Sequence, residues 1–342
     1  MSYLGVKVSS VAPCRGLQER AMDSAELKGL LAAVKRLTRG QRAELLAALG
    51  AGGDDTQVCL LLESRLSQTQ ACPHCDGTRI VRNGSASGLQ RYKCRACQRT
   101  FNALSTTPLA RLRMKAKWLR QQDVLLQGLS VKQASAALDV ADTTAFRWRH
   151  RFLQLTQAVK ATALTGVVEA DETFFLRSSK GQRPGHKPRK PRKRGGRASR
   201  EERGMDLMPV LVARDRSGAT ADFLLEAVSK ACLSQALKPR IQSDAILCTD
   251  GSAAMAAAAR ELGVQHEAVN LSAGQRVRGP WHIQNANAYH SRLKSWMARF
   301  KGVATSYLEN YLGWFRALDR VSKTGQKTAP MLALAVGLQG HH

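Results

Sequence analysis

The stretch GVVEADETFF, residues 166–175, determines the fold of the larger part of this chain. Its β-branched and aromatic residues favour a strand, and it is apolar except for three acidic residues and a threonine. A carboxylate in a strand that is otherwise destined for burial costs free energy, unless a partner such as a divalent cation compensates for it. Asp171 lies in the middle of this stretch. For Glu169 and Glu172 we expect an exposed or salt-bridged position in the strand.

A second apolar stretch, AILCTDGS at residues 245–252, ends in Asp250 followed by Gly251. Carboxylates that follow strands gather at the carboxyl edge of an α/β sheet, where these folds place their sites. Two such carboxylates on neighbouring strands can share a pair of Mg²⁺ ions, which clamp the attacking and leaving oxygens of a phosphoryl transfer. The alternative for Asp250 is a structural role as a turn or helix-capping residue before Gly251.

From about residue 166 onward, β-rich runs mix with helical periodicity, which predicts a mixed α/β domain. The expected strands are Val167–Leu176, Met208–Val212 and Ala245–Thr249, and the expected helices lie around 222–236, 252–262 and 285–299. A basic segment rich in Gly and Pro, residues 177–203, interrupts this pattern as a loop.

The charge of the chain indicates a polyanionic partner. The 342 residues include 53 Lys and Arg against 26 Asp and Glu, a net charge of +27 with an isoelectric point near 10.5. This charge is concentrated, because residues 177–203 hold 12 basic and two acidic side chains, whereas residues 1–69 hold 9 basic and 7 acidic ones. Each phosphate that such a patch neutralises releases counterions, so nucleic acid is the leading partner.

Composition also excludes several classes of protein. Hydrophobic residues make up 44% of the chain, enough to bury a sizeable core, so wholesale disorder is excluded. The longest apolar run, Met331–Leu338, falls well short of the ~18 residues of a membrane span. The N-terminus lacks a signal-peptide pattern. We therefore expect a cytoplasmic, nucleoid-associated protein that contacts no membrane.

Four of the eight cysteines form two C-x2-C pairs, CPHC at 72–75 and CRAC at 94–97. Each pair can place both thiolates on one tetrahedral ion from a tight turn, and two turns complete a four-thiolate site. In an intracellular chain this spacing favours zinc over disulfides. We expect a structural Zn²⁺ ion, held by Cys72, Cys75, Cys94 and Cys97, with His74 as an alternative ligand. Short strands over Thr78–Asn83 and Leu89–Tyr92, with a turn at 84–88, complete a zinc ribbon.

A helix-turn-helix is predicted over residues 130–152. Ser130 and Gln133 form a capping box for a helix over Val131–Leu138, and a turn follows at Asp139–Ala141. Asp142 or Thr143 is expected to cap the second helix. On that helix we expect Thr143, Thr144 and Arg147 to face DNA bases, Phe146 and Trp148 to lie in the core, and Arg149, His150 and Arg151 to lie on the remaining faces.

Residues 23–50 predict two short amphipathic helices. Asp23 and Glu26 give a start signal for the first, and Thr38 and Gln41 give a capping box for the second. We expect a small helical packing or interaction module.

The order of these elements resembles that of bacterial insertion-sequence transposases of the DDE superfamily, and it is most similar to the ISXO-like branch with its N-terminal zinc ribbon. The resemblance spans residues 70–318. Besides the ribbon and the helix-turn-helix it includes VVEADETFF, ILCTDG and the block HIQNANAYHSRLKSWMARFKGVATSYLENYLGWFR at residues 282–316.

The resemblance implies a ribonuclease-H-like catalytic core, an α/β fold with a mixed sheet flanked by helices. It makes Asp171 and Asp250 the first two catalytic residues. In this branch the third is a Glu, Asn or His on a helix, seven residues before a Lys. Alignment on Lys294 makes Asn287 the third residue, and His290 is the alternative. His282 is expected to be structural.

The domains expected on this basis are a helical N-terminal module at 1–66, the zinc ribbon at 67–105, the helix-turn-helix at 110–158, the catalytic domain at 162–320 and a tail at 321–342.

We therefore expect a DNA transposase that cuts the ends of an insertion sequence and joins the 3′ ends to target DNA. Two Mg²⁺ or Mn²⁺ ions at Asp171, Asp250 and Asn287 are expected to support this reaction, and Lys294 to contact the DNA backbone. Double-stranded DNA is also expected to contact the basic residues Arg189, Lys190, Arg192, Lys193 and Arg194.

Because two ends are cut together, we expect a homodimer or a larger assembly. Two alternatives remain open at this point. One is a metal-dependent nuclease on the same fold, and the other is a non-catalytic regulator that binds DNA through the ribbon and the helix-turn-helix.

Overall fold

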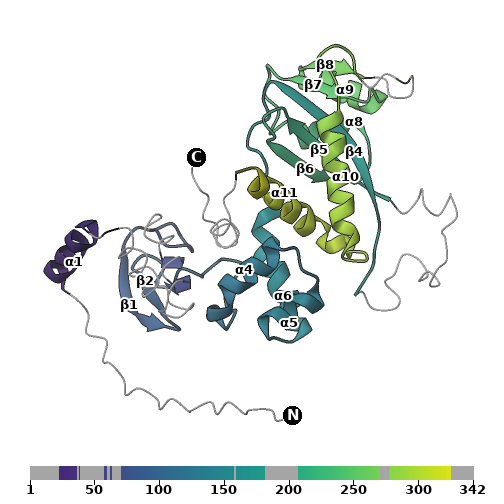
Figure 1. Cartoon of the computed structure of the whole chain (residues 1–342). Helices are drawn as coiled ribbons and strands as arrows, with labels where there is room; N and C mark the ends of the chain where they lie inside the picture. The colour runs from purple at the N-terminus through teal and green to yellow at the C-terminus, as the bar shows by residue number, and fades with distance from the viewer. Residues whose placement is uncertain are drawn as a thin grey trace, which may run out of the picture. The chain divides into compact units, whose positions relative to one another are not determined.

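The computed structural model describes residues 23–36, 71–157, 159–181, 207–269 and 277–324, together with a few isolated positions between them. The chain divides into two compact units, Met1–Gly53 and Asp54–His342. Figure 1 labels the helices and strands.

In the first unit the structure describes α1 (Ser24–Arg36). Asp23 caps this helix, because its Oδ1 accepts the N–H groups of Ala25 and Glu26 at 2.7 and 2.8 Å. The N–H of Asp23 in turn donates to the Glu26 carboxylate at 3.0 Å. The predicted start signal is confirmed, whereas the second predicted helix lies beyond Thr38, outside the described residues.

The cysteine-containing segment forms three antiparallel strands, β1 (Ile80–Ala86), β2 (Leu89–Cys94) and β3 (Thr100–Phe101). The prediction of a turn over 84–88 is wrong, because β1 continues to Ala86 and pairs there with Leu89. The turn is only Ser87 and Gly88, whose φ angles of 53° and 76° fit a two-residue type I′ hairpin. Gly84 lies instead within an irregularity of β1 between Arg82 and Ser85.

The helix-turn-helix consists of α5 (Val131–Leu138) and α6 (Asp142–Leu153), preceded by the 3-10 helix η1 (Lys115–Lys117) and α4 (Trp118–Leu126). The capping box is confirmed, since Ser130 Oγ accepts the N–H of Gln133 at 3.3 Å and Gln133 Oε1 accepts that of Ser130 at 2.9 Å.

The predicted cap of the second helix is wrong. Its N-cap is Ala141, which has no side-chain hydrogen bond to offer. Asp142 lies in the first turn of α6, where its carboxylate accepts a hydrogen bond of 2.5 Å from the Ser135 hydroxyl. That bond ties α6 to α5 across the turn.

A five-stranded mixed sheet forms the centre of the remaining described residues (Figure 1). Its strands are β4 (Val167–Leu176), β5 (Leu207–Asp215), β6 (Thr220–Leu224), β7 (Ile246–Thr249) and β8 (Gln265–Ala268). Their order in space is β6-β5-β4-β7-β8. Strands β4, β5 and β6 are antiparallel neighbours, and β7 and β8 run parallel to β4. This is the ribonuclease-H-like arrangement, so the predicted fold is confirmed.

Two helices cover each face of the sheet. Leu211 and Ala213 of β5 pack with α8 (Lys230–Leu237) and α9 (Ala253–Leu262). The alternate residues Val210 and Val212 pack with α10 (Gln284–Ala298) and α11 (Leu308–Thr324). The side chains of Trp296, Tyr311, Trp314 and Phe315 are buried in this second core.

The predicted helix around residues 222–236 is wrong in its first half, because residues 220–224 form the edge strand β6. Asp222 is buried there and forms an ion pair with Arg316 of α11, whose guanidinium also donates to the carbonyl oxygens of Thr156 and Gln157. A buried acid in a strand is stabilised by this distant partner, which the local sequence does not reveal.

Arg149 joins α6 to α11, so its predicted place on an outer face is wrong. Its side chain is buried, and its guanidinium donates to the carbonyl of Leu129 at 2.6 Å and lies 5.2 Å from the centre of the Trp314 ring. The Trp314 indole donates in turn to the carbonyl of Leu125 at 2.9 Å. Phe146 is also placed wrongly by the prediction, because it is 40% exposed and contacts Tyr307.

Across the described residues, no helix combines the length and the apolar character that crossing a membrane requires. The run Met331–Leu338 lies outside those residues.

Candidate active site and DNA-binding elements

The sheet brings Asp171 and Asp250 together. Strands β4 and β7 are parallel and pair at Val167–Ile246, Val168–Leu247 and Glu169–Cys248. Two residues further in this register, Asp250 follows the end of β7 beside Asp171, and neighbouring strands are about 4.8 Å apart. Because side chains alternate between the faces, Asp171 lies on the same face as Glu169, the face that α10 covers.

Asp250 combines a turn contact with an oxygen that is open to a ligand. Its Oδ1 accepts the N–H of Ser252 at 3.0 Å, and Ser252 rather than Asp250 caps α9. The predicted alternative of a helix cap is therefore wrong, although a turn role holds for one oxygen. The other oxygen accepts no hydrogen bond from the described residues and remains available to a ligand.

Glu172 lies within the electrostatic reach of both aspartates. Burial, together with the negative charges of Asp171 and Asp250, raises the pKa of Glu172 to about 7. Its Oε1 is buried and has no hydrogen-bond partner among the described residues. The prediction of an exposed or salt-bridged Glu172 is therefore wrong, and three carboxyl groups contribute negative potential at this edge of the sheet.

Helix α10 presents the remaining predicted residues. His290 is buried, and its Nδ1 lies 3.5 Å from Asp171 Oδ2. Asn287 is half-buried one turn earlier, and Lys294 is exposed one turn later. The structure thus brings His290 to Asp171, and it places Asn287 and Lys294 on the same helix on either side of that contact.

Glu169 anchors the first turn of α10. It is fully buried, and its carboxylate accepts the backbone N–H groups of Asn285 and Ala286 at 2.7 and 3.1 Å and the Asn285 side-chain amide at 2.8 Å. Arg216 Nε and His282 Nδ1 lie 3.0 and 3.2 Å from the same carboxylate. The predictions of a salt-bridged Glu169 and of a structural His282 are confirmed. The sequence did not reveal that Glu169 caps a helix 116 residues away.

The described acidic residues do not form a preformed cage of three or more metal ligands. Among the described residues, only the four predicted zinc ligands bring three or more His, Cys, Asp or Glu ligand atoms within 4.8 Å of one another. Two adjacent carboxylates with few further protein ligands suit a hard divalent cation that keeps water and takes phosphate oxygens as ligands. The donor set therefore fits such an ion.

Residues 163–316, the segment that holds this site, match the family described as the ISXO2-like transposase domain. This segment is therefore similar to an ISXO2-like transposase domain. Residues 107–158, just before it, match a homeodomain-like domain, which agrees with the helix-turn-helix. Such a transposase family implies a divalent metal ion.

A relative in Halobacterium salinarum is described as an uncharacterized protein in transposable element ISH50. It is 28% identical over 286 residues, which cover 82% of this chain and 95% of the relative. Similarity to solved structures is weak. A simian T-cell lymphotropic virus intasome with a PP2A regulatory subunit gives a TM-score of 0.27 at 13% identity, over 52% of this chain and 56% of that one. A pre-cleavage Mos1 transpososome gives a TM-score of 0.22 at 14% identity, over 95% of this chain and 82% of that one.

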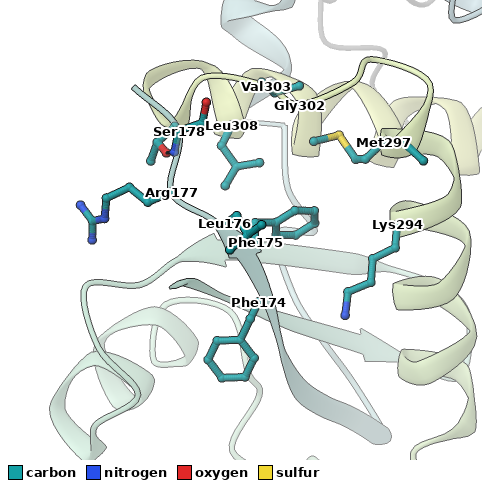
Figure 2. A pocket seen from close by; sticks show the side chains of 12 residues that line it. Phe174, Phe175, Leu176, Arg177, Ser178, Lys294, Met297, Gly302, Val303 and Leu308 are labelled. Carbon is teal, nitrogen blue, oxygen red and sulfur yellow. Dashed lines mark hydrogen bonds between the residues drawn. The ribbon is translucent and has the colours of Figure 1, made fainter. Parts of the chain in front are cut away.

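A pocket of about 460 Å³ lies at the far end of β4, beyond Asp171 along the strand. Phe174, Phe175 and Arg177 line it from the strand side, and Lys294 and Met297 line it from α10. Figure 2 shows the Lys294 side chain extending from its helix toward the strand. A cation in this place suits a phosphate of a nucleic acid that runs past the two aspartates.

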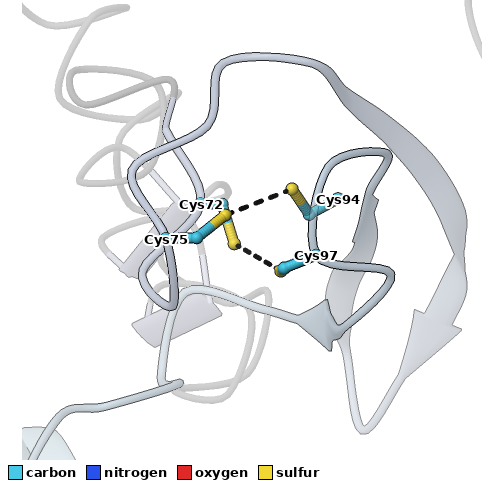
Figure 3. A group of neighbouring side chains, drawn as sticks. All are labelled: Cys72, Cys75, Cys94 and Cys97. Atoms are coloured by element: carbon cyan, nitrogen blue, oxygen red, sulfur yellow. Dashed lines mark hydrogen bonds between the residues drawn. The ribbon is translucent and has the colours of Figure 1, made fainter.

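The four predicted zinc ligands converge in the segment before the helix-turn-helix (Figure 3). The Sγ atoms of Cys72 and Cys97 are 3.7 Å apart, as are those of Cys75 and Cys94. A tetrahedral site with Zn–S bonds of about 2.3 Å requires S···S separations of about 3.8 Å, so the geometry fits zinc. His74 is exposed and is not part of this cluster.

Both cysteine turns share one backbone feature. The residue after the second cysteine of each pair, Asp76 or Gln98, is left-handed, with φ angles of 56° and 61°. A backbone hydrogen bond from Cys97 lowers the pKa of the Cys94 thiol to about 7. Although a backbone hydrogen bond from Gly77 acts to lower it, hydrogen bonds with the other three thiols and burial raise the pKa of the Cys75 thiol to about 12.

The predicted DNA-reading residues lie at the surface of α6. Thr143 and Arg147 are exposed and Thr144 is half-buried. Trp148 is buried, as predicted. The basic residues Arg189, Lys190, Arg192, Lys193 and Arg194 lie outside the described residues.

Proposed function

We propose that this chain is a DNA transposase that cuts the ends of an insertion sequence and joins the freed 3′ ends to target DNA. The observation that supports this most strongly is the register of β4 and β7, which aligns Asp171 with Asp250 on a ribonuclease-H-like sheet. The match of residues 163–316 to a transposase family supports the same proposal.

In this proposal Asp171 and Asp250 hold two Mg²⁺ or Mn²⁺ ions. Bound there, the ions supply charge neutralisation at the scissile phosphate and a nucleophilic oxygen at neutral pH. The chain's own residues orient the DNA. Glu169 fixes α10 over the sheet, and Lys294 holds the DNA backbone beside the site.

The third residue of the site is either Asn287 or His290. His290 is supported by its contact with Asp171 Oδ2. Asn287 is supported by its spacing from Lys294, because an amide oxygen two helical turns before the lysine shares its face. We expect the more damaging of the two alanine substitutions, measured by the rate of strand joining, to identify the third residue.

The helix-turn-helix and the zinc ribbon bind the ends of the element in this proposal, and the basic segment 177–203 contributes further contacts to DNA. Since two ends react together, the active form is proposed to be a homodimer or a larger assembly.

The experiment is a strand-transfer assay in Mg²⁺ with DNA ends taken from the flanks of the gene. Joined products from the wild-type protein support the transposase. Cleavage without joining supports a nuclease on the same fold. DNA binding with no reaction, unchanged on replacement of Asp171, supports a non-catalytic regulator.

A further inference from the structure

A cleft beside α6 is lined by three arginines that the proposed reaction does not use. Arg111 and Arg113 lie in the segment before η1, and Thr144 and Arg147 lie on α6. Together with neighbouring side chains they enclose about 390 Å³. Within the described residues, none of the three guanidinium groups forms an ion pair with an acidic side chain.

The charge of this cleft selects an anionic ligand. Three like charges around one hollow repel one another, and an anion between them removes that repulsion. An arginine guanidinium can donate two parallel hydrogen bonds to the oxygens of a phosphate. The Thr144 hydroxyl, on a shorter side chain, adds another hydrogen-bond donor. The composition therefore suits a phosphate group better than a carboxylate, which offers fewer oxygens.

The segment with Arg111 and Arg113 is held rigidly in place. Arg111 and Met114 are left-handed, with φ angles of 62° and 57°, which is unfavourable for such side chains and persists only where contacts maintain it. Arg151 of α6 supplies these contacts, because its guanidinium donates to the carbonyl oxygens of Pro108 and Ala110. The Trp118 indole donates to the carbonyl of Arg113 at 3.2 Å. The cleft is thus preformed.

We propose that this cleft binds a phosphate of the DNA backbone on which the helix-turn-helix docks. The inference rests on the proposed function for its DNA ligand. It assigns Arg111, Arg113 and Arg147 to positioning the helix on the backbone rather than to reading bases. Thr143, which is exposed and outside the cleft, is then the α6 residue that faces the base edges.

The test compares duplex binding of three full-length proteins across a series of salt concentrations. The first is the wild type, the second is Arg111→Gln/Arg113→Gln, and the third is Arg120→Gln, an exposed arginine of α4 that is outside the cleft. Each protein is measured with the duplex that flanks the gene and with an unrelated duplex. Thermal unfolding of each protein confirms that it is folded.

We expect the double variant to bind both duplexes about tenfold more weakly or worse, because it no longer forms charge-assisted bonds to phosphate. The slope of log affinity against log salt should fall by about one for each phosphate that the variant no longer neutralises. Arg120→Gln should change neither quantity by comparable amounts.

Three results would overturn the proposal. One is a wild-type affinity and slope in the folded double variant. Another is a weakening confined to the flanking duplex, which would assign the cleft to base reading. The third is competition by inorganic phosphate that the double variant abolishes while its DNA slope is unchanged, which would assign the cleft to free phosphate.

Failure of the proposed reaction is separable from these results. An Asp171→Asn protein that joins no ends but binds DNA with the wild-type salt slope leaves the cleft assignment intact, because Asp171 is not part of the cleft.

Discussion

Replacement of Glu169 by alanine removes the carboxylate that anchors α10 to the sheet. Glu169 is fully buried and accepts three hydrogen bonds from Asn285 and Ala286, so the substitution leaves three donors without an acceptor. Breaking a buried ion pair costs about 3–5 kcal/mol. The Arg216 side chain is 36% exposed and can turn toward water, so we expect the lower limit, about 3 kcal/mol of unfolding free energy.

The assay is equilibrium denaturation in urea, with Glu261→Ala as the matched control. Glu261 pairs with Lys230 at 2.9 Å, but its side chain is 46% exposed and the pair is screened by solvent, so its removal should destabilise the protein far less. Glu169→Gln keeps the shape without the charge and should fall between these two variants in stability. A Glu169→Ala protein as stable as the Glu261→Ala protein would refute the anchoring role.

Three further predictions concern other parts of the chain. A Cβ at Gly313 would lie 2.6 Å from the backbone of Thr156, so Gly313→Ala should cost about 1–3 kcal/mol of unfolding free energy. Gly29 has open space around it, so Gly29→Ala should not destabilise the protein. Equal unfolding midpoints for the two variants would contradict this packing. Replacement of Cys72 by serine should abolish the binding of about one zinc ion per chain, as measured with a metallochromic dye. The control Cys232→Ser should still bind this ion. A Cys72→Ser protein that binds zinc fully would rule out the proposed ligand set. Burial, with the charge of Arg149, lowers the pKa of His150 to about 4 in the folded state. Between about pH 6.5 and pH 4 the histidine is therefore protonated in the unfolded state but not in the folded state. The unfolding free energy should fall as the pH drops through this window. Unfolding midpoints across that window should fall less steeply in His150→Gln, and parallel slopes would count against the buried neutral histidine.

Local sequence patterns correctly predicted the elements whose interaction partners lie nearby in the sequence. The capping box at Ser130, the paired cysteines and the apolar strand around Asp171 all have their partners, or their structural signal, within a few residues. The resemblance to transposases added the expectation of a ribonuclease-H-like core with a mixed sheet. The alignment of Asp171 with Asp250 then follows from the parallel register of two strands.

The errors occur where a distant residue decides the outcome. The burial of Asp222 in an edge strand is compensated by its ion pair with Arg316. The burial of Arg149 is compensated by a hydrogen bond to the Leu129 carbonyl and by the contact with the Trp314 ring. Glu169 is buried because a helix begins on it 116 residues later. None of these partners lies close enough in sequence to leave a periodic pattern.

Glycine misled the prediction of the hairpin for a different reason. Gly84 and Gly88 are both left-handed, and each marks a break in regular pairing. Only Gly88 is in the turn, because Ala86 and Leu89 pair directly, whereas Gly84 falls at an irregularity of β1. Sequence alone does not distinguish a bulge glycine from a turn glycine.

The central claim is that Asp171 and Asp250 form one metal-dependent site for strand transfer. Its most direct test is the rate of 3′-end joining in Mg²⁺ by Asp250→Asn, compared with Asp244→Asn, an exposed aspartate just before β7. Loss of a metal ligand removes several kcal/mol of transition-state stabilisation, so joining by Asp250→Asn should fall about a thousandfold while DNA binding persists. Asp244→Asn should join ends at the wild-type rate. Equal rates for the two variants would contradict the account.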